Sequence, residues 1–152
     1  MYEEKALTAI TNALRTRYGE PGVAAARLLQ KWISGDVAFA DVEVIARHLD
    51  PSRLPLVYDA FRQNVPFGTG GQRGPVGYGP NRINPANLAI TVQGHCDFLR
   101  AHWKGRKTLS VVVACDVREF RDLSRRYAFL GDDHPLIGLT SRKLGQLACE
   151  IY

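Results

Sequence analysis

Apolar side chains recur at helical spacing through the first sixty or so residues, so the chain is predicted to open with short helices. The positions that define them are Leu7, Ile10 and Leu14, then Val23, Ala26, Leu29 and Ile33, then Val37, Ala40 and Val44, and finally Val57, Ala60 and Phe61. The Gly-Glu-Pro-Gly cluster at 19–22 is expected to end the first helix, and the third to cover about 36–49. Asp50-Pro51 offers an N-cap followed by proline at the first helical position of the fourth. We expect residues 1–64 to form a helical N-terminal extension.

The pattern changes abruptly at Val65. The next fifteen or so residues are punctuated by glycine at positions 68, 70, 71, 74, 77 and 79, and by proline at positions 66, 75 and 80. Neither a helix nor a long regular strand accommodates that spacing, so the segment is predicted to be a shaped loop.

Residues 65–152 then follow a helix–strand–helix pattern. Asn84-Pro85 is predicted to begin a helix, and the β-branched run from Thr108 to Cys115 is typical of a strand buried on both faces. A polar loop leads to Thr140-Ser141 and a last amphipathic helix. That helix has no glycine, asparagine or proline to end it before Tyr152, and such a unit normally feeds another strand. We therefore expect an α/β domain whose natural sequence continues beyond Tyr152.

Composition narrows the class of protein only partly. The 152 residues are 45% apolar and 23% charged, as in ordinary globular proteins. A net charge of +5 is spread along the chain and is compatible with sugar phosphates, nucleic acid or simple solubility. The odd count of three cysteines favours a reducing compartment, and neither a signal peptide nor a membrane span is evident, so a cytoplasmic location is expected.

The glycine-rich loop carries the strongest indication of chemistry. Around Thr69, Gly70 and Gly71, backbone N–H groups are free to approach an anion, and Arg73 supplies a planar fork of donors. A phosphate is the natural guest, although the loop is neither a Walker loop nor a dinucleotide fingerprint. The alternative is a structural glycine loop with a surface arginine. Arg82 is expected to be a surface or intraloop partner and not a ligand contact.

The glycine-rich loop and the segments after it resemble a known protein family. Phe67-Gly68-Thr69-Gly70-Gly71-Gln72-Arg73-Gly74 resembles the F-G-T-[AS]-G-[LIM]-R-G signature that opens the first domain of α-D-phosphohexomutases. Residues 77–84 resemble the G-x-G-P-N-R-x-N continuation of the phosphoglucomutase/phosphopentomutase-like branch, 111–118 a buried strand ending in D-x-R, and 141–142 the S-R that opens the next helix. This chain departs from the family pattern at Gly70, Gln72 and Cys115.

The resemblance implies an intramolecular phosphotransferase, a phosphoglucomutase or phosphomannomutase type of isomerase. In such enzymes a phosphoserine exchanges its phosphoryl group with a hexose or pentose phosphate through a bisphosphate intermediate, with Mg²⁺ beside it. It also implies a three-layer αβα first domain with a mixed sheet, with the remaining domains of the same protein as partners. Arg73 would stabilise the phosphoserine or phosphate. The serine loop (T-A-S-H-N-P) and the metal loop (D-G-D-G-D-R) are absent, so the fragment alone is expected to be inactive, with no metal ligands of its own.

Other candidate residues are given structural interpretations. Asp116 and Arg118 lie two apart at the predicted strand end and are expected to form an ion pair that supports the glycine loop. Ser141 is interpreted as an N-cap, Asp132-Asp133-His134 as a solvated turn, and His95 as a packed or surface histidine. Two alternatives to the mutase stay open: a non-catalytic phosphate-binding module, and nucleic-acid binding, which rests on charge alone. Membrane partners are not expected.

Overall fold

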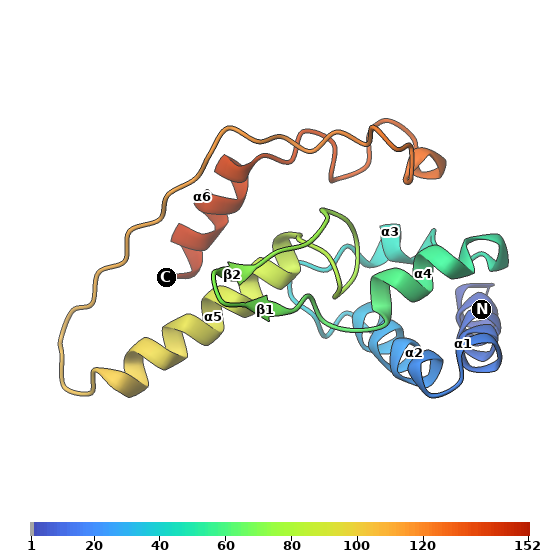
Figure 1. The fold of residues 1–152 in the computed structure, drawn as a ribbon, viewed down its shortest axis with the longest axis horizontal. Helices are drawn as coiled ribbons and strands as arrows, with labels where there is room; N and C mark the ends of the chain where they lie inside the picture. The colour runs from blue at the N-terminus through green and yellow to red at the C-terminus, as the bar shows by residue number, and fades with distance from the viewer. Residues whose placement is uncertain (1) are drawn as a thin grey trace. The chain divides into compact units, whose positions relative to one another are not determined.

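The structure, a computed structural model, describes the backbone of residues 2–152 and the side chains from Glu4 onward. It combines helices with a small sheet and divides into two compact units, one up to Asn84 and the other from Pro85 to Tyr152 (Figure 1). The composition change at Val65 lies inside the first unit, because the glycine-rich loop is bonded to the helices that precede it.

Four α-helices and one 3-10 turn build the first unit. They are α1 (Tyr2–Tyr18), α2 (Glu20–Ile33), α3 (Val42–Ala46), η1 (Pro51–Arg53) and α4 (Leu54–Phe61). The predicted order of helices is confirmed, but the third is much shorter than 36–49. Its N-cap is Asp41, whose carboxylate accepts a hydrogen bond from the Val44 N–H at 3.1 Å. The Asp36 carboxylate instead accepts a hydrogen bond from Ser34 Oγ, so the residues before Asp41 form turns.

The junction between α1 and α2 uses its two glycines differently. Gly19 takes a φ of 59°, a left-handed conformation that glycine adopts without steric cost, and the chain turns there as predicted. Gly22 lies inside α2 against α1: a Cβ at this position would stand 2.0 Å from the Leu14 carbonyl oxygen. Gly22 therefore sets how closely the two helices approach.

The core of the first unit lies between α1, α2 and α4. Ile10 and Leu14 of α1, Leu29 of α2 and Val57 of α4 are completely buried. Trp32 meets Phe61 edge to face with ring centroids 6.2 Å apart. Burying aliphatic or aromatic side chains of this size is worth about 1.5–3 kcal/mol each, so this packing fixes the position of α4. The glycine-rich loop starts from the end of α4.

The second unit pairs α5 (Pro85–His102) with α6 (Ser141–Ile151). Val92 and Cys96 of α5 and Ala148 of α6 form its small buried cluster, with Val113 packed at the edge. Between the helices the chain runs without regular structure, apart from the 3-10 turn η2 (Ala128–Leu130). The described residues include no helix long and apolar enough to cross a bilayer.

The predicted buried strand at 108–115 is not formed. This segment belongs to neither strand of the structure; Val112 is 93% exposed and Val111 37%. A strand is stable only when neighbouring strands satisfy its backbone groups and cover its faces, and residues 2–152 place none beside it. The prediction from β-branched composition was wrong here, because composition gives only a propensity and pairing partners decide whether a strand forms.

Candidate functional site

A short hairpin projects from the glycine-rich loop. Strand β1 (Phe67–Gly68) pairs antiparallel with β2 (Gly71–Gln72), with Phe67 opposite Gln72 and Gly68 opposite Gly71 (Figure 1). Thr69 and Gly70 form the turn, and both are exposed. Gly71 has a φ of 106°, which a residue with a side chain rarely adopts. The hairpin thus presents backbone with little side-chain cover, the first requirement for contact with an anion.

Arg73 follows directly after β2, and its side chain folds back over the turn. A Cβ added to Gly70 would lie 3.2 Å from Arg73 Nη2, so the guanidinium is beside the Gly70 backbone. Arg73 is exposed, and within the described part of the chain no carboxylate forms an ion pair with it. A cation without a counter-ion next to bare backbone amides is the arrangement that binds a phosphate or sulfate.

Backbone hydrogen bonds close the base of the loop, which we define as Val65, Pro75–Gly77 and Pro80–Asn84. Val65 N–H donates to the Pro80 carbonyl at 2.7 Å, and Ile83 N–H donates to the Pro75 carbonyl at 2.9 Å. Asn84 Nδ2 donates to the carbonyls of Gly77 and Gly79, both at 2.9 Å. The hairpin and Arg73 therefore project from a closed, bonded base and do not form part of an open loop.

Arg82 belongs to this base and not to the surface. Its side chain is only 2% exposed, and Nη2 forms an ion pair with Asp59 Oδ2 of α4. Nη1 donates to the Asn81 carbonyl at 2.8 Å. The sequence left open whether Arg82 lies on the surface or pairs within the loop. In the structure it is buried and pairs with Asp59, so its side chain joins the loop to α4.

The close approach of loop and helix also accounts for Gly79. Its φ is 99°, and a Cβ there would lie 2.8 Å from the Ala60 carbonyl oxygen. Next to it, Tyr78 is buried and meets the ring of His48 edge to face at 5.5 Å. Nothing in the sequence linked His48 to this loop.

The second unit contains the other predicted pair. Arg118 Nε donates to Asp116 Oδ2 at 2.6 Å, and Ser141 Oγ donates to Asp116 Oδ1 at 2.6 Å. The bond from Ser141 is the largest cause that lowers the pKa of Asp116 to about 2; the Arg118 backbone N–H adds to it. The helix cap is Thr140, which accepts from Lys143 N–H, so Ser141 is not the N-cap that the sequence suggested. This cluster fastens the start of α6 to the segment before it.

The pKa of Asp116 gives a prediction. Ser141→Ala is expected to raise that pKa from about 2 toward the ordinary value of 3.8, because the strongest hydrogen bond to the carboxylate is lost. Since the folded pKa is depressed, the cluster stabilises the fold above pH 3.8 and loses this contribution as the pH falls toward 2. Carboxyl-carbon NMR titration measures the shift.

A matched control exists in the same unit. Ser124→Ala removes a hydroxyl that reaches Asp122 Oδ1 at 3.4 Å, and it should leave the titration of Asp116 unchanged. An Asp116 pKa that is equal in wild type and Ser141→Ala would contradict the assignment of Ser141 as its main hydrogen-bond donor.

The remaining candidate residues make packing contacts or hydrogen bonds within the protein. His134 is buried, with its ring beside Phe120 and Tyr127, so it is a packed residue and not part of a solvated turn. His95 is exposed, and its Nδ1 lies 2.6 Å from the Tyr152 hydroxyl. Among the described residues, no three His, Cys, Asp or Glu side chains come close enough to hold a metal ion.

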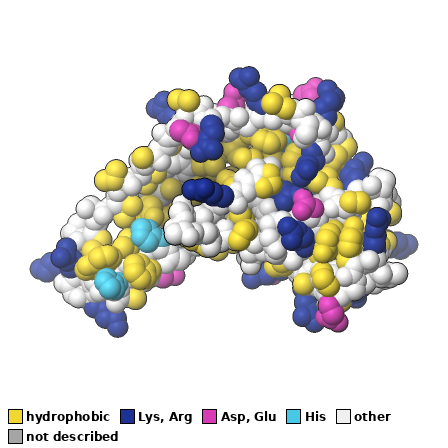
Figure 2. Space-filling view, viewed as in Figure 1, with side chains coloured by type: hydrophobic (Ala, Val, Ile, Leu, Met, Phe, Trp, Pro, Cys, Tyr) yellow, Lys and Arg dark blue, Asp and Glu magenta, His cyan; other side chains and the backbone are white. Residues whose placement is uncertain are grey.

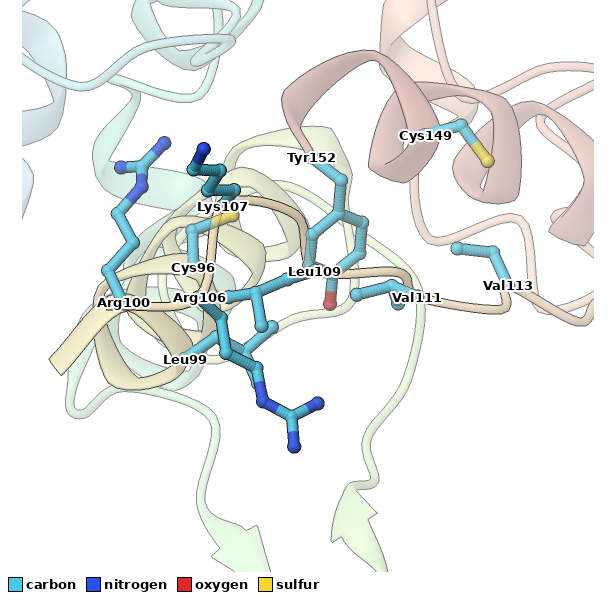
Figure 3. A pocket seen from close by; sticks show the side chains of 10 residues that line it. All are labelled: Cys96, Leu99, Arg100, Arg106, Lys107, Leu109, Val111, Val113, Cys149 and Tyr152. Atoms are coloured by element: carbon cyan, nitrogen blue, oxygen red, sulfur yellow. The ribbon is translucent and has the colours of Figure 1, made fainter. Parts of the chain in front are cut away.

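One cavity of about 490 Å³ lies within the second unit, and it holds none of the predicted site residues. Apolar side chains such as Leu99, Leu109 and Val111 line it together with Tyr152, and Arg106 contributes a charge (Figure 3). Burial and the neighbouring Cys96 raise the pKa of Tyr152. Arg100 and Lys107 add two more charges to its lining, and Leu109, Val111 and Val113 of the segment 108–115 form part of its wall.

Figure 2 shows Lys and Arg spread over the visible face, with Asp and Glu among them. In the Arg-rich stretch 118–126, Asp122 accepts backbone hydrogen bonds from Arg126 and Tyr127 at 3.0 and 2.7 Å.

The hairpin and the unpaired Arg73 thus define a candidate oxyanion-binding site. In comparisons with known proteins, the chain is 30% identical over 92 residues to the phosphopentomutase of Mus musculus. That match covers 60% of this chain but only 13% of the mouse protein. No family model matches the chain, and no solved structure matches it. The comparison agrees with a phosphosugar mutase type of protein, and the chain spans about an eighth of the relative's length.

Asp59 is the residue that the sequence did not single out. It lies on α4, 23 positions before its partner Arg82. Within its own helix Asp59 has a possible partner in Arg62, three residues later, but such pairs are common on helix surfaces. A pairing across so many residues has no periodicity, so only the tertiary structure reveals it.

Proposed function

We propose that this chain supplies the phosphate-binding loop of a phosphosugar mutase of the α-D-phosphohexomutase family. One observation carries the proposal: the guanidinium of Arg73 lies beside the Gly70 backbone at the tip of an exposed hairpin, and no carboxylate among the described side chains pairs with it. The mouse phosphopentomutase supports the proposal through its sequence similarity.

The chemistry of phosphoryl transfer suits such a site. The reaction depends mostly on positioning and on stabilising charge around the phosphoryl oxygens, because the protein has little covalent work to do. Arg73 would bind two of those oxygens, and amides of the hairpin at Thr69, Gly70 and Gly71 would bind others. Phosphoserine donation and the bisphosphate intermediate would require residues that this chain does not contain, and Mg²⁺ would supply charge neutralisation at the phosphoryl group when bound.

The name of the mouse relative makes pentose phosphates the first substrates to test, with hexose phosphates next. A three-layer αβα domain is likewise proposed for the longer protein. In it, further strands would complete the sheet that this chain leaves unformed.

Arg73→Ala is expected to weaken binding of inorganic phosphate or sulfate to this chain by about 1.5–3 kcal/mol, the range for charge-assisted hydrogen bonds. That is a loss of roughly 10- to 150-fold in affinity. The fold should change little, because the Arg73 side chain is exposed. NMR titration of the hairpin amides measures both the affinity and the integrity of the fold.

Arg27→Ala is the matched control, since Arg27 is an exposed arginine on α2 in the same unit. It removes the same charge and should leave phosphate affinity nearly unchanged. Equal titrations for wild type and Arg73→Ala would refute the binding role. A longer protein containing this segment that fails to interconvert ribose or glucose 1-phosphate with its isomer, given Mg²⁺ and a bisphosphate primer, would refute the mutase. Phosphate binding without that activity would favour a non-catalytic module.

A further inference from the structure

We propose that Asp59 is a positioning residue for the anion-binding hairpin. Its carboxylate holds the buried Arg82, and through Arg82 it fixes the base of the loop from which Arg73 projects. This inference rests on the proposed function, because it concerns how the phosphate-binding geometry is maintained.

The two carboxylate oxygens of Asp59 contact two arginines that differ in burial, and this difference indicates the positioning role. Oδ2 pairs with Arg82, whose side chain is 2% exposed, whereas Oδ1 reaches Arg62 Nε at 3.5 Å on the surface of the helix. A guanidinium withdrawn from water requires a partner that neutralises it. The exposed Arg62 pair carries no such requirement. The pairing with Arg82 is therefore the one that determines structure.

Asn81 adds a second connection between α4 and the loop. Its Nδ2 donates to the Asp59 carbonyl at 2.8 Å, and its backbone N–H donates to the Ala60 carbonyl at 3.0 Å. Asp59 and Ala60 thus hold two consecutive loop residues, Asn81 and Arg82.

From Asn81 and Arg82 the bonds lead directly to both ends of the hairpin. Pro80, just before them, accepts from Val65 N–H at 2.7 Å, two residues ahead of β1. Ile83, just after them, donates to the Pro75 carbonyl at 2.9 Å, two residues beyond Arg73. Movement of Arg82 would therefore displace both ends of the segment that carries the hairpin and Arg73.

The charges around Asp59 are compatible with anion binding at the hairpin. Asp59 is balanced by Arg82 and Arg62, so the three side chains together carry one net positive charge. Asp59 can hold the loop without presenting an uncompensated negative charge to a phosphate.

The test is a double-mutant cycle on the whole chain, read as the Kd for inorganic phosphate. Asp59→Asn is expected to weaken phosphate binding by about 3- to 30-fold, which lies within the coupling range for residues that act through one network. In the Arg73→Ala background the same change should have little further effect, because the displaced donor is already absent. An effect only on stability would leave the Kd of the folded protein unchanged in both backgrounds.

A second readout needs no phosphate. Asp59→Asn should speed amide hydrogen exchange at Val65 and Ile83, whose N–H groups close the base of the loop. Asp97→Asn, which removes the exposed carboxylate paired with Arg100 on α5, should change neither readout. Asp59→Glu keeps the carboxylate but moves it by one methylene, and it should give intermediate values.

The outcomes separate this inference from the proposed function. If wild type does not bind phosphate, the proposed function fails, and the exchange rates still decide whether Asp59 holds the loop. If wild type binds phosphate and Asp59→Asn binds it equally well with unchanged exchange, the positioning role is overturned. If Asp59→Asn does not fold, Asp59→Glu takes its place, and an unchanged Kd and exchange rate would overturn the role equally.

Discussion

Arg82→Ala is expected to lower the free energy of unfolding of the first unit by about 2–5 kcal/mol, the range for truncating a large buried side chain to alanine. The arginine side chain is 2% exposed, so its removal leaves an unfilled space as well as a carboxylate without its main partner. The Nη1 bond to the Asn81 carbonyl is lost too. The loop base should therefore loosen before the helices unfold.

Trp32 reports this unfolding because it is buried among the helices of the first unit, edge to face with Phe61. Chemical denaturation followed by fluorescence, in a Trp103→Phe background that removes the second tryptophan, isolates the signal. Arg62→Ala is the matched control: it removes the other arginine at Asp59, which is 42% exposed, and should cost at most about 1 kcal/mol. Equal costs for the two substitutions would show that burial of Arg82 does not govern its contribution.

Gly22→Ala is expected to destabilise the first unit by about 3 kcal/mol, at the upper end for overpacking. The added Cβ would stand 2.0 Å from the Leu14 carbonyl oxygen and 2.6 Å from its carbon. Both atoms belong to the backbone of α1, so no side-chain rotation relieves the contact. The helices must move apart, which also disturbs the packing of Leu14 and Ala26.

The same substitution at Gly94 should act in the opposite direction. Gly94 lies within α5, and a Cβ there meets nothing within 4 Å, so alanine gains helix propensity without a clash. A stabilisation of about 0.5–1 kcal/mol is expected, measured by thermal unfolding with far-ultraviolet circular dichroism. A neutral or stabilising Gly22→Ala would mean that α1 and α2 do not pack at the distance described.

Sequence patterns predicted some elements well because the signals there are local. The break at Gly19, the helix that follows Asn84-Pro85 and the final helix from Ser141 each depend on capping residues or turn chemistry within a few positions. The prediction of a long third helix was wrong, because Asp41 caps a short one and the residues before it form turns. The spacing of apolar residues does not show which local hydrogen bonds form, so it could not predict that this helix begins at Asp41.

The sequence by itself determined the glycine-rich loop, the presence of Arg73 within it and most of the helices, since backbone freedom, charge and periodicity are properties of neighbouring residues. Only the tertiary structure decided the roles of Asp59, Arg82 and Gly22, and the exposure of residues 108–115. Those outcomes depend on which surfaces meet across many residues. A buried guanidinium needs a partner, and the fold decides which residue that is. A β-branched segment becomes a strand only beside another strand.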